Sequence, residues 1–183
     1  MNFVEKAVIM NASDMARAVK RMAHEILEAN RGTENLVVLG IQRRGVSLAR
    51  MITEAIKQVE GIDLPSGALD ITFYRDDLST LGPSPQVAST EMPFDVTEKV
   101  IILVDDVLYT GRTVRAALGV IMDWGRPQAI QLAVLIDRGH RELPIRPDYV
   151  GKNVPTSQRE IVKVRVQEFD GIEQVVVGEV HES

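Results

Sequence analysis

The chain contains no cysteine, few aromatic residues and no long apolar run, and each absence narrows its possible class. Without cysteine no disulfide framework can form, and the first thirty residues show no basic-then-apolar signal region, so we expect a cytoplasmic protein. Charged residues interrupt every apolar run before the roughly eighteen residues that a membrane span needs, so no membrane partner is expected. A net charge of −5 argues against a general affinity for DNA or other nucleic acid, although it leaves room for one local basic face.

The apolar residues that are present recur with the spacing of strands and helices. A chain of 183 residues with 45% hydrophobic residues suffices for one core, so we expect a single domain over residues 1–183. Helices are predicted at about 14–30, with Ser13 as N-cap, at 46–59 and at 113–124. Strands are predicted at 6–10, 36–39, 69–74, 100–104, 130–136, 161–166 and 174–180. This alternation predicts an α/β fold with a parallel sheet, whose binding loops lie at the carboxyl ends of the strands.

Two segments do not fit this alternation. Residues from about 75 to 98 carry Pro83, Pro85 and Pro93 and are too long and too broken for a tight turn, which predicts a mobile arm. Residues from about 137 to 166 begin with a stretch dense in charge, and we expect this part of the chain to complete a sheet or a hood over the site.

The segment from 100 to 113 carries the most chemistry. An apolar strand ends in Asp105 and Asp106, and Thr110-Gly111-Arg112-Thr113 then opens a helix. The free amides of a helix start attract an anion, the hydroxyls of Thr110 and Thr113 add donors, and Gly111 lets the backbone approach closely. Two carboxylates beside this cradle suit the hydroxyls of a ribose, so a sugar-phosphate site is predicted. The alternative is that the aspartates merely solvate a strand end and cap the next helix.

The same segment resembles the 5-phosphoribosyl pyrophosphate (PRPP) motif of the type I phosphoribosyltransferases, which has four apolar residues, two acids, a short hydrophobic stretch and Thr-Gly-x-Thr. The resemblance implies a central, mainly parallel, twisted sheet flanked by helices, with a small hood and a flexible arm. It also implies that Asp105 and Asp106 hold the ribose hydroxyls while residues 107–113 wrap the 5-phosphate. The residues expected to bind PRPP are Ile101, Ile102, Leu103, Val104, Asp105, Asp106, Val107, Leu108, Tyr109, Thr110, Gly111, Arg112 and Thr113.

A second anion site is predicted in the loop that precedes the helix at 46–59. By resemblance this is the pyrophosphate loop, and its members are Gln42, Arg43, Arg44 and Gly45. Arg43 or Arg44 can neutralise a leaving pyrophosphate, although two solvated arginines before a helix are the alternative. No cluster of histidines and carboxylates predicts an all-protein metal site, so Mg²⁺ is expected to arrive on PRPP.

Arg75 begins the predicted arm, which in relatives of this family closes over the substrate. Together with Asp105 and Asp106 it is assigned a catalytic role, which we expect to consist of positioning and electrostatic stabilisation. An ordinary exposed loop at this place is the alternative. No residue is assigned as general base.

Tyr109 indicates which base is used. The purine enzymes that share the motif carry an acid at this position, which can handle a purine ring nitrogen, so Tyr109 favours a pyrimidine. The base-binding residues that the family implies are Arg138, Gly139, His140 and Val162.

Further blocks resemble one branch of the family, the bifunctional regulators of bacterial pyrimidine operons. The matching blocks are residues 70–72, 74–78, 107–109, 137–144 and 151–157. This branch implies that uracil and PRPP give uridine monophosphate (UMP) and pyrophosphate. It also implies that the chain, with UMP or uridine triphosphate (UTP) bound, binds a stem-loop in the leader of pyrimidine-operon messenger RNA.

The first predicted helix carries a basic stripe that suits such an RNA partner, because Arg17, Lys20, Arg21 and His24 share one face. The residues that the branch implies for RNA binding are Lys20, Arg21, His24, His140, Arg141, Arg146 and Lys152. A homodimer or homotetramer would present more than one stripe and so strengthen binding. A solvated helix face is the alternative. For the whole chain, the alternatives are a nucleotide-sensing RNA regulator with little turnover, or a purine-base phosphoribosyltransferase without an RNA role.

Overall fold

A computed structural model describes residues 2–77 and 89–181 of the chain, and the middle of the predicted arm, residues 78–88, lies outside the described residues. The elements follow one another in the order β1 (Asn2–Met10), α1 (Ala12–Asn30), β2 (Leu36–Ile41), α2 (Arg44–Glu60), β3 (Ser66–Leu69), η1 (Thr72–Tyr74), β4 (Val100–Leu108), α3 (Arg112–Trp124), β5 (Ala129–Asp137), β6 (Tyr149–Asn153), β7 (Glu160–Arg165), α4 (Gln167–Asp170) and β8 (Gln174–His181).

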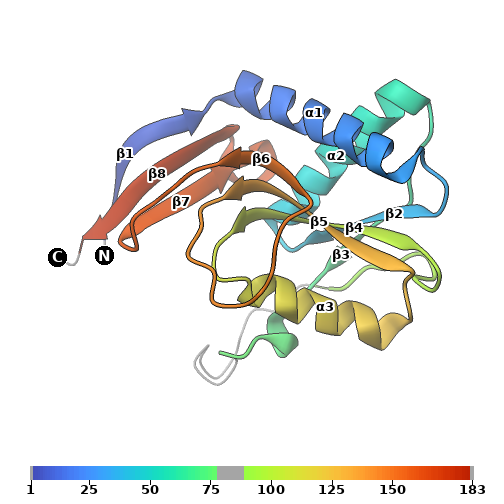
Figure 1. Cartoon of the computed structure of the whole chain (residues 1–183). Coiled ribbons are helices and arrows are strands. Elements are labelled where there is room, and N and C mark those ends of the chain that lie inside the picture. The colour runs from blue at the N-terminus through green and yellow to red at the C-terminus, as the bar shows by residue number, and fades with distance from the viewer. Residues whose placement is uncertain (1, 78–88, 182–183) are drawn as a thin grey trace.

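The larger of two sheets has the strand order β3-β2-β4-β5-β6, and each neighbouring pair is parallel. Helices α1 and α2 cover one face of this sheet and α3 covers the other (Figure 1). The predicted α/β class and the mainly parallel sheet flanked by helices are therefore confirmed. Within the described ranges, no helix is both long enough and apolar enough to cross a membrane.

Strand β4 shows why the centre of the sheet is apolar on both faces. Ile102 and Val104 pack into the core under α1 and α2, whereas Ile101 and Leu103 pack into the core under α3, and all four are at most 1% exposed. Burying an aliphatic side chain of this size contributes roughly 1.5–3 kcal/mol, so β4 is held firmly between the two layers of helices. The register of β4 fixes where its carboxyl end, and thus Asp105, is placed.

Helix α1 begins two residues earlier than predicted. Its N-cap is Asn11, not Ser13, because the Asn11 side chain accepts from the Asp14 amide at 2.8 Å while the Asp14 carboxylate accepts from the Asn11 amide at 3.0 Å. This reciprocal capping box satisfies two backbone donors that the helix itself leaves unpaired. The predicted apolar face, including Met15, Val19 and Met22, is buried as expected.

The strand predicted over 69–74 is wrong. Strand β3 ends at Leu69, where Asp70 Oδ1 accepts from the Thr72 amide at 2.8 Å and from its hydroxyl at 2.6 Å. This local turn competes with strand pairing, and residues 72–74 form a short 3₁₀ helix instead. The chain comes back to the edge of the sheet at Glu91, which forms an isolated antiparallel bridge with Ala68 of β3.

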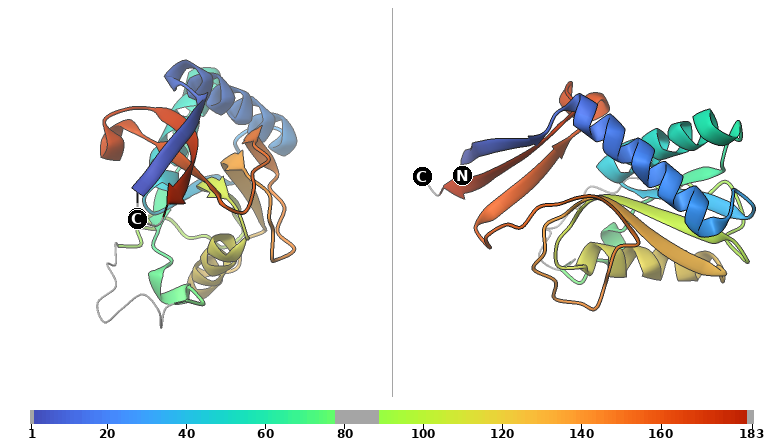
Figure 2. Two further views of the ribbon diagram at one scale, coloured as in Figure 1. Left: turned by 90° about the vertical axis from the view of Figure 1, so that its left-hand side faces the viewer. Right: turned by 45° about the horizontal axis from the view of Figure 1, so that its top comes forward.

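The smaller sheet, β1-β8-β7, is antiparallel and is built from both ends of the chain. The two views of Figure 2 show it standing beyond the carboxyl ends of the large sheet, where a hood is expected. The predicted hood range of about 137–166 includes β6, which belongs to the large sheet, and leaves out β1 and β8. Strand β6 and helix α4 were not predicted.

Candidate active site

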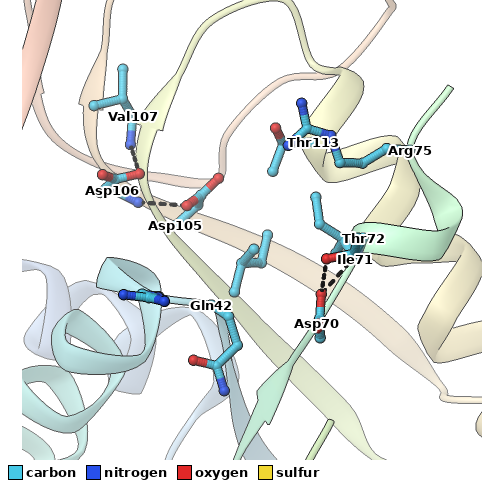
Figure 3. Close-up of a pocket in the computed structure, with 11 residues that line it drawn as sticks. Gln42, Asp70, Ile71, Thr72, Arg75, Asp105, Asp106, Val107 and Thr113 are labelled. Carbon is cyan, nitrogen blue, oxygen red and sulfur yellow. Dashed lines mark hydrogen bonds between the residues drawn. The ribbon is translucent and has the colours of Figure 1, made fainter. Parts of the chain in front are cut away.

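A cavity of about 810 Å³ lies at the carboxyl ends of β2 and β4, between the start of α3 and the segment that follows β3. Figure 3 shows its walls, from which side chains of β2, of β4 and of residues 70–75 face one space. Its lining residues are Ile41, Gln42, Arg43, Asp70, Ile71, Thr72, Arg75, Asp105, Asp106, Val107 and Thr113. The structure thus brings together members of the predicted PRPP motif, the predicted pyrophosphate loop and the start of the predicted arm.

The acidic pair forms one wall of this cavity. Asp105 is buried, and its Oδ1 accepts from the Asp106 amide at 2.9 Å, while Asp106 Oδ1 accepts from the Val107 amide at 2.8 Å. Burial, followed by the proximity of the Asp106 carboxylate, raises the pKa of Asp105 well above its ordinary value. The remaining oxygens can accept from ligand hydroxyls, and a ligand that donates to them offsets the cost of burying this charge.

The segment predicted to cradle a phosphate forms the start of α3. Gly111 is the N-cap with φ of +93°, a conformation that favours glycine, and the first helical amides of α3 follow it. Thr113 faces the cavity, whereas Thr110 accepts from the Arg112 amide at 3.3 Å. The side chain of Arg112 is held outside the cradle by ion pairs to Asp76 at 2.6 Å and Glu142 at 2.7 Å.

The predicted pyrophosphate loop packs tightly against β4. The Gln42–Arg43 peptide bond is cis, and a Cβ added to Gly45 would lie 2.6 Å from the Val104 carbonyl oxygen. Gln42 and Arg43 line the cavity. Arg44 points elsewhere and lines a second hollow of about 440 Å³ between Asp106 and the hood. The structure thus separates the two arginines that the sequence offered as alternatives for neutralising pyrophosphate.

The residues predicted to bind the base fall into two groups. Arg138 is buried, with its guanidinium carbon 3.9 Å from the centre of the Tyr109 ring and its Nε donating to Thr156 at 3.2 Å. His140 approaches the same ring edge-on at 6.1 Å, and Gly139 lies exposed between these two residues. Val162 instead lines the second hollow, beside Asp106 and Arg44.

Four cavity residues were missed as binding residues by sequence reasoning, namely Ile41, Asp70, Ile71 and Thr72. Asp70, Ile71 and Thr72 were quoted as a family-like block without a role, and the structure places all three on the cavity wall. The Oδ2 atom of Asp70 is buried and has no hydrogen-bond partner within the described residues. The available signal was a carboxylate directly after a strand of the parallel sheet, but the wrong strand assignment over 69–74 concealed it. Arg75, predicted to be catalytic, also lines the cavity and pairs with Asp77 at 2.7 Å.

The predicted RNA-binding residues lie on α1, in the loop after β5 and on β6. Lys20 and His24 are exposed, as is Arg146, while Arg21 pairs with Glu25 and donates to the Gly151 carbonyl at 2.5 Å. Lys152 and Arg21 line a shared hollow of about 400 Å³ together with Arg17, on the same face of α1.

Arg141 is a predicted RNA-binding residue whose guanidinium bonds three groups around the loop after β5. It donates to the carbonyl oxygens of Tyr109 at 2.8 Å and Ile145 at 2.9 Å, and it forms an ion pair with Asp137 at 2.7 Å. These bonds tie the loop after β5 to the end of the PRPP motif.

The phosphoribosyl transferase domain family matches residues 8–168 of the chain. A hypoxanthine-guanine phosphoribosyltransferase from Bacillus anthracis shares the fold, with a TM-score of 0.72, 20% identity and coverage of 97% of this chain and 100% of that chain. The chain therefore belongs to the phosphoribosyl transferase domain family, and its fold is that of a phosphoribosyltransferase.

Closer relatives define the branch. The bifunctional protein PyrR of Pelotomaculum thermopropionicum is 64% identical over 97% of this chain and 98% of its own length, and that of Thermus aquaticus is 60% identical over 95% and 96%. The chain belongs to the PyrR family of phosphoribosyltransferases. This membership confirms the predicted resemblance and, with it, the expectation of a bifunctional phosphoribosyltransferase.

Proposed function

We propose that this chain transfers the 5-phosphoribosyl group of PRPP to uracil, giving UMP and pyrophosphate, and that it also binds a pyrimidine-operon leader RNA in response to UMP or UTP. The observation that carries the first activity is the single cavity in which Asp105 and Asp106, the start of α3 and the loop at Gln42 and Arg43 meet. An acidic pair between two anion-binding sites suits a ribose that carries a phosphate at one end and a pyrophosphate at the other.

Each wall of the cavity has a distinct task in this reaction. The helix start at Gly111 holds the 5-phosphate, and Thr113 donates to it. Asp105 and Asp106 accept from the ribose hydroxyls and, being anionic, stabilise the positive charge that develops on the sugar. Arg43 and the loop amides attract the negative charge that develops on the pyrophosphate, together with Mg²⁺ carried by the substrate.

The base end is formed by Tyr109, Arg138 and His140, with Val162 across the second hollow. The uracil N1 bonds to the anomeric carbon as the bond to pyrophosphate breaks, and the N1 proton is released. Arg75 lines the cavity wall, where its positive charge would help to stabilise the departing pyrophosphate.

Pyrophosphate release from PRPP and Mg²⁺ tests this proposal when it is measured with uracil, with hypoxanthine and without a base. Of these three conditions, we expect pyrophosphate release only when uracil is present. A Thr113→Val variant should raise the KM for PRPP because it loses one hydrogen-bond donor to the phosphate. Release with hypoxanthine but not with uracil would contradict the pyrimidine assignment. Tight UMP binding without release would favour a nucleotide-sensing regulator with little turnover.

The RNA activity is supported by the exposure of Lys20 and His24 beside the hollow that Arg17, Arg21 and Lys152 line. In a chain whose net charge is −5, this local gathering of cations is the feature that an RNA backbone would recognise. A homodimer or homotetramer in the cytoplasm, presenting this face more than once, suits a folded stem-loop better than a single copy.

Binding of a pyrimidine-leader stem-loop, with and without UMP, measures this activity. A double Lys20→Ala, His24→Ala variant should weaken RNA binding while uracil turnover is retained, and Lys57→Ala on the end of α2 is the matched control. An equal affinity for unrelated RNA at moderate salt would contradict specific recognition. Because Arg141 bonds inside the protein, Arg141→Ala should disturb turnover as well as RNA binding.

A further inference from the structure

The short helix α4 connects the hood to the start of α2, although the two are far apart in sequence. The Glu168 carboxylate accepts from the Ser47 hydroxyl at 3.0 Å and from Arg50 at 2.9 Å. Both partners lie within the first two turns of α2. The next two residues of α4, Phe169 and Asp170, contact the start of α2 and the residue before it.

Phe169 and Asp170 contact the two arginines of the predicted pyrophosphate loop. The guanidinium carbon of Arg43 lies 5.9 Å from the centre of the Phe169 ring, within the range of a cation–π contact. Asp170 accepts two hydrogen bonds from Arg44, at 3.1 Å from Nε and 2.7 Å from Nη2. Consecutive residues of the hood therefore hold consecutive residues of the loop.

The contact between Asp170 and Arg44 has the geometry of a strong ion pair. It is bidentate, the Asp170 side chain is only 18% exposed, and Asp170 Oδ2 also accepts from the Val166 amide at 2.8 Å. The pairing lowers the pKa of Asp170 and raises that of Arg44, so both groups stay charged at neutral pH. The Asp170 carboxylate is therefore held by the hood backbone as well as by Arg44.

We propose that Asp170 is a positioning residue which, by holding Arg44, sets the geometry of the pyrophosphate loop and joins it to the hood. This inference rests on the proposed transferase function. The same hood carries Val162, predicted to face the base, so one rigid connection runs from the base end of the site to the pyrophosphate end. Arg44 then acts through loop geometry, and Arg43 is the residue that faces the cavity.

The Asp170→Asn variant tests this role because it keeps the size of the side chain and the acceptor for the Val166 amide while removing the charge. We expect inorganic pyrophosphate with Mg²⁺, titrated by calorimetry, to bind about tenfold more weakly, whereas UMP affinity changes less than twofold. Amide hydrogen exchange at Val46 and Ser47 should be faster in the unliganded variant. Asp170→Glu should restore most of the pyrophosphate affinity. Glu179→Gln removes another hood ion pair, to Lys6, and should change neither ligand.

The outcomes separate the alternatives. Equal weakening of both ligands, together with a lower melting temperature, would show a general structural role and overturn the proposal. Tighter pyrophosphate binding would also overturn it, because Asp170 would then withhold Arg44 from the ligand. A wild-type protein that binds neither ligand would overturn the proposed function as well. A wild-type protein that binds both, with Asp170→Asn unchanged in binding and exchange, would overturn the positioning role alone.

Discussion

Replacing Asp105 by asparagine should stabilise the unliganded protein while impairing its activity. Asparagine has nearly the same shape, and its Oδ1 can still accept from the Asp106 amide that Asp105 holds at 2.9 Å. The substitution therefore removes a charge that is buried beside a second carboxylate and leaves the packing intact. An uncompensated buried polar group costs about 1–3 kcal/mol, so the free energy of unfolding at pH 7 should rise by about that amount.

The stability difference between the wild type and the asparagine variant should depend on pH. Because the pKa of Asp105 is higher in the folded protein than in the unfolded chain, the folded protein binds this proton more tightly. The wild type therefore loses stability relative to the asparagine variant as pH rises from the unfolded pKa through the folded one, and the difference disappears in acid. For a chain of this length, about 1–3 kcal/mol corresponds to a rise in melting temperature of about 2–12 °C.

Urea unfolding of both proteins without ligand, between pH 4 and pH 8, measures this difference. The control is Asp63→Asn, whose side chain is 78% exposed and which should change stability by less than about 0.5 kcal/mol. Turnover of the Asp105→Asn variant should fall by about 10- to 100-fold, since a charge-assisted hydrogen bond contributes about 1.5–3 kcal/mol. A variant that is less stable than the wild type at pH 7, or a difference that does not shrink in acid, would refute the reasoning.

Three further predictions concern the loop, the first helix and the base end of the site. Gly45→Ala should destabilise the protein by about 1–3 kcal/mol in urea and weaken pyrophosphate binding, because the new Cβ would meet a backbone carbonyl at 2.6 Å, which cannot move aside as a flexible side chain would. Asn11→Ala should cost about 1 kcal/mol of unfolding free energy without altering uracil turnover, whereas Ser13→Ala should cost almost nothing. Tyr109→Ala should raise the KM for uracil by about 2- to 30-fold, since a cation–π contact with Arg138 contributes about 0.5–2 kcal/mol, while Tyr109→Phe should behave like the wild type.

The buried strands were predictable because their information is local. The apolar runs that begin at Leu36, Val100 and Ile130 have no polar face, which is typical of parallel strands covered on both sides. The same holds for the two acids in the last half of β4 and the glycine turn that follows this strand, since neighbouring residues in sequence form that part of the site.

The rest depended on contacts between distant segments. Nothing near Arg44 indicates that its guanidinium pairs with a carboxylate 126 residues later, and the sequence left it interchangeable with Arg43. Strand β6 contains Gly151 and Lys152 and is too polar to stand out, so its pairing with β5 decides its conformation. The turn at Asp70 is a different case, because it is local: its side chain accepts from the Thr72 amide where alternating residues had predicted a continuing strand.

The pairing of β1 with β8 has a consequence for the order of folding. Asn2 lies opposite His181, so this contact closes nearly the whole chain, and the entropy of closing such a loop is roughly 4–5 kcal/mol. Because loop closure of this length is costly, we expect this contact to form after the more local contacts of the large sheet. Strand β1 is therefore made well before its neighbour β8, and we expect the candidate site to gain its cover only after β8 has been synthesised.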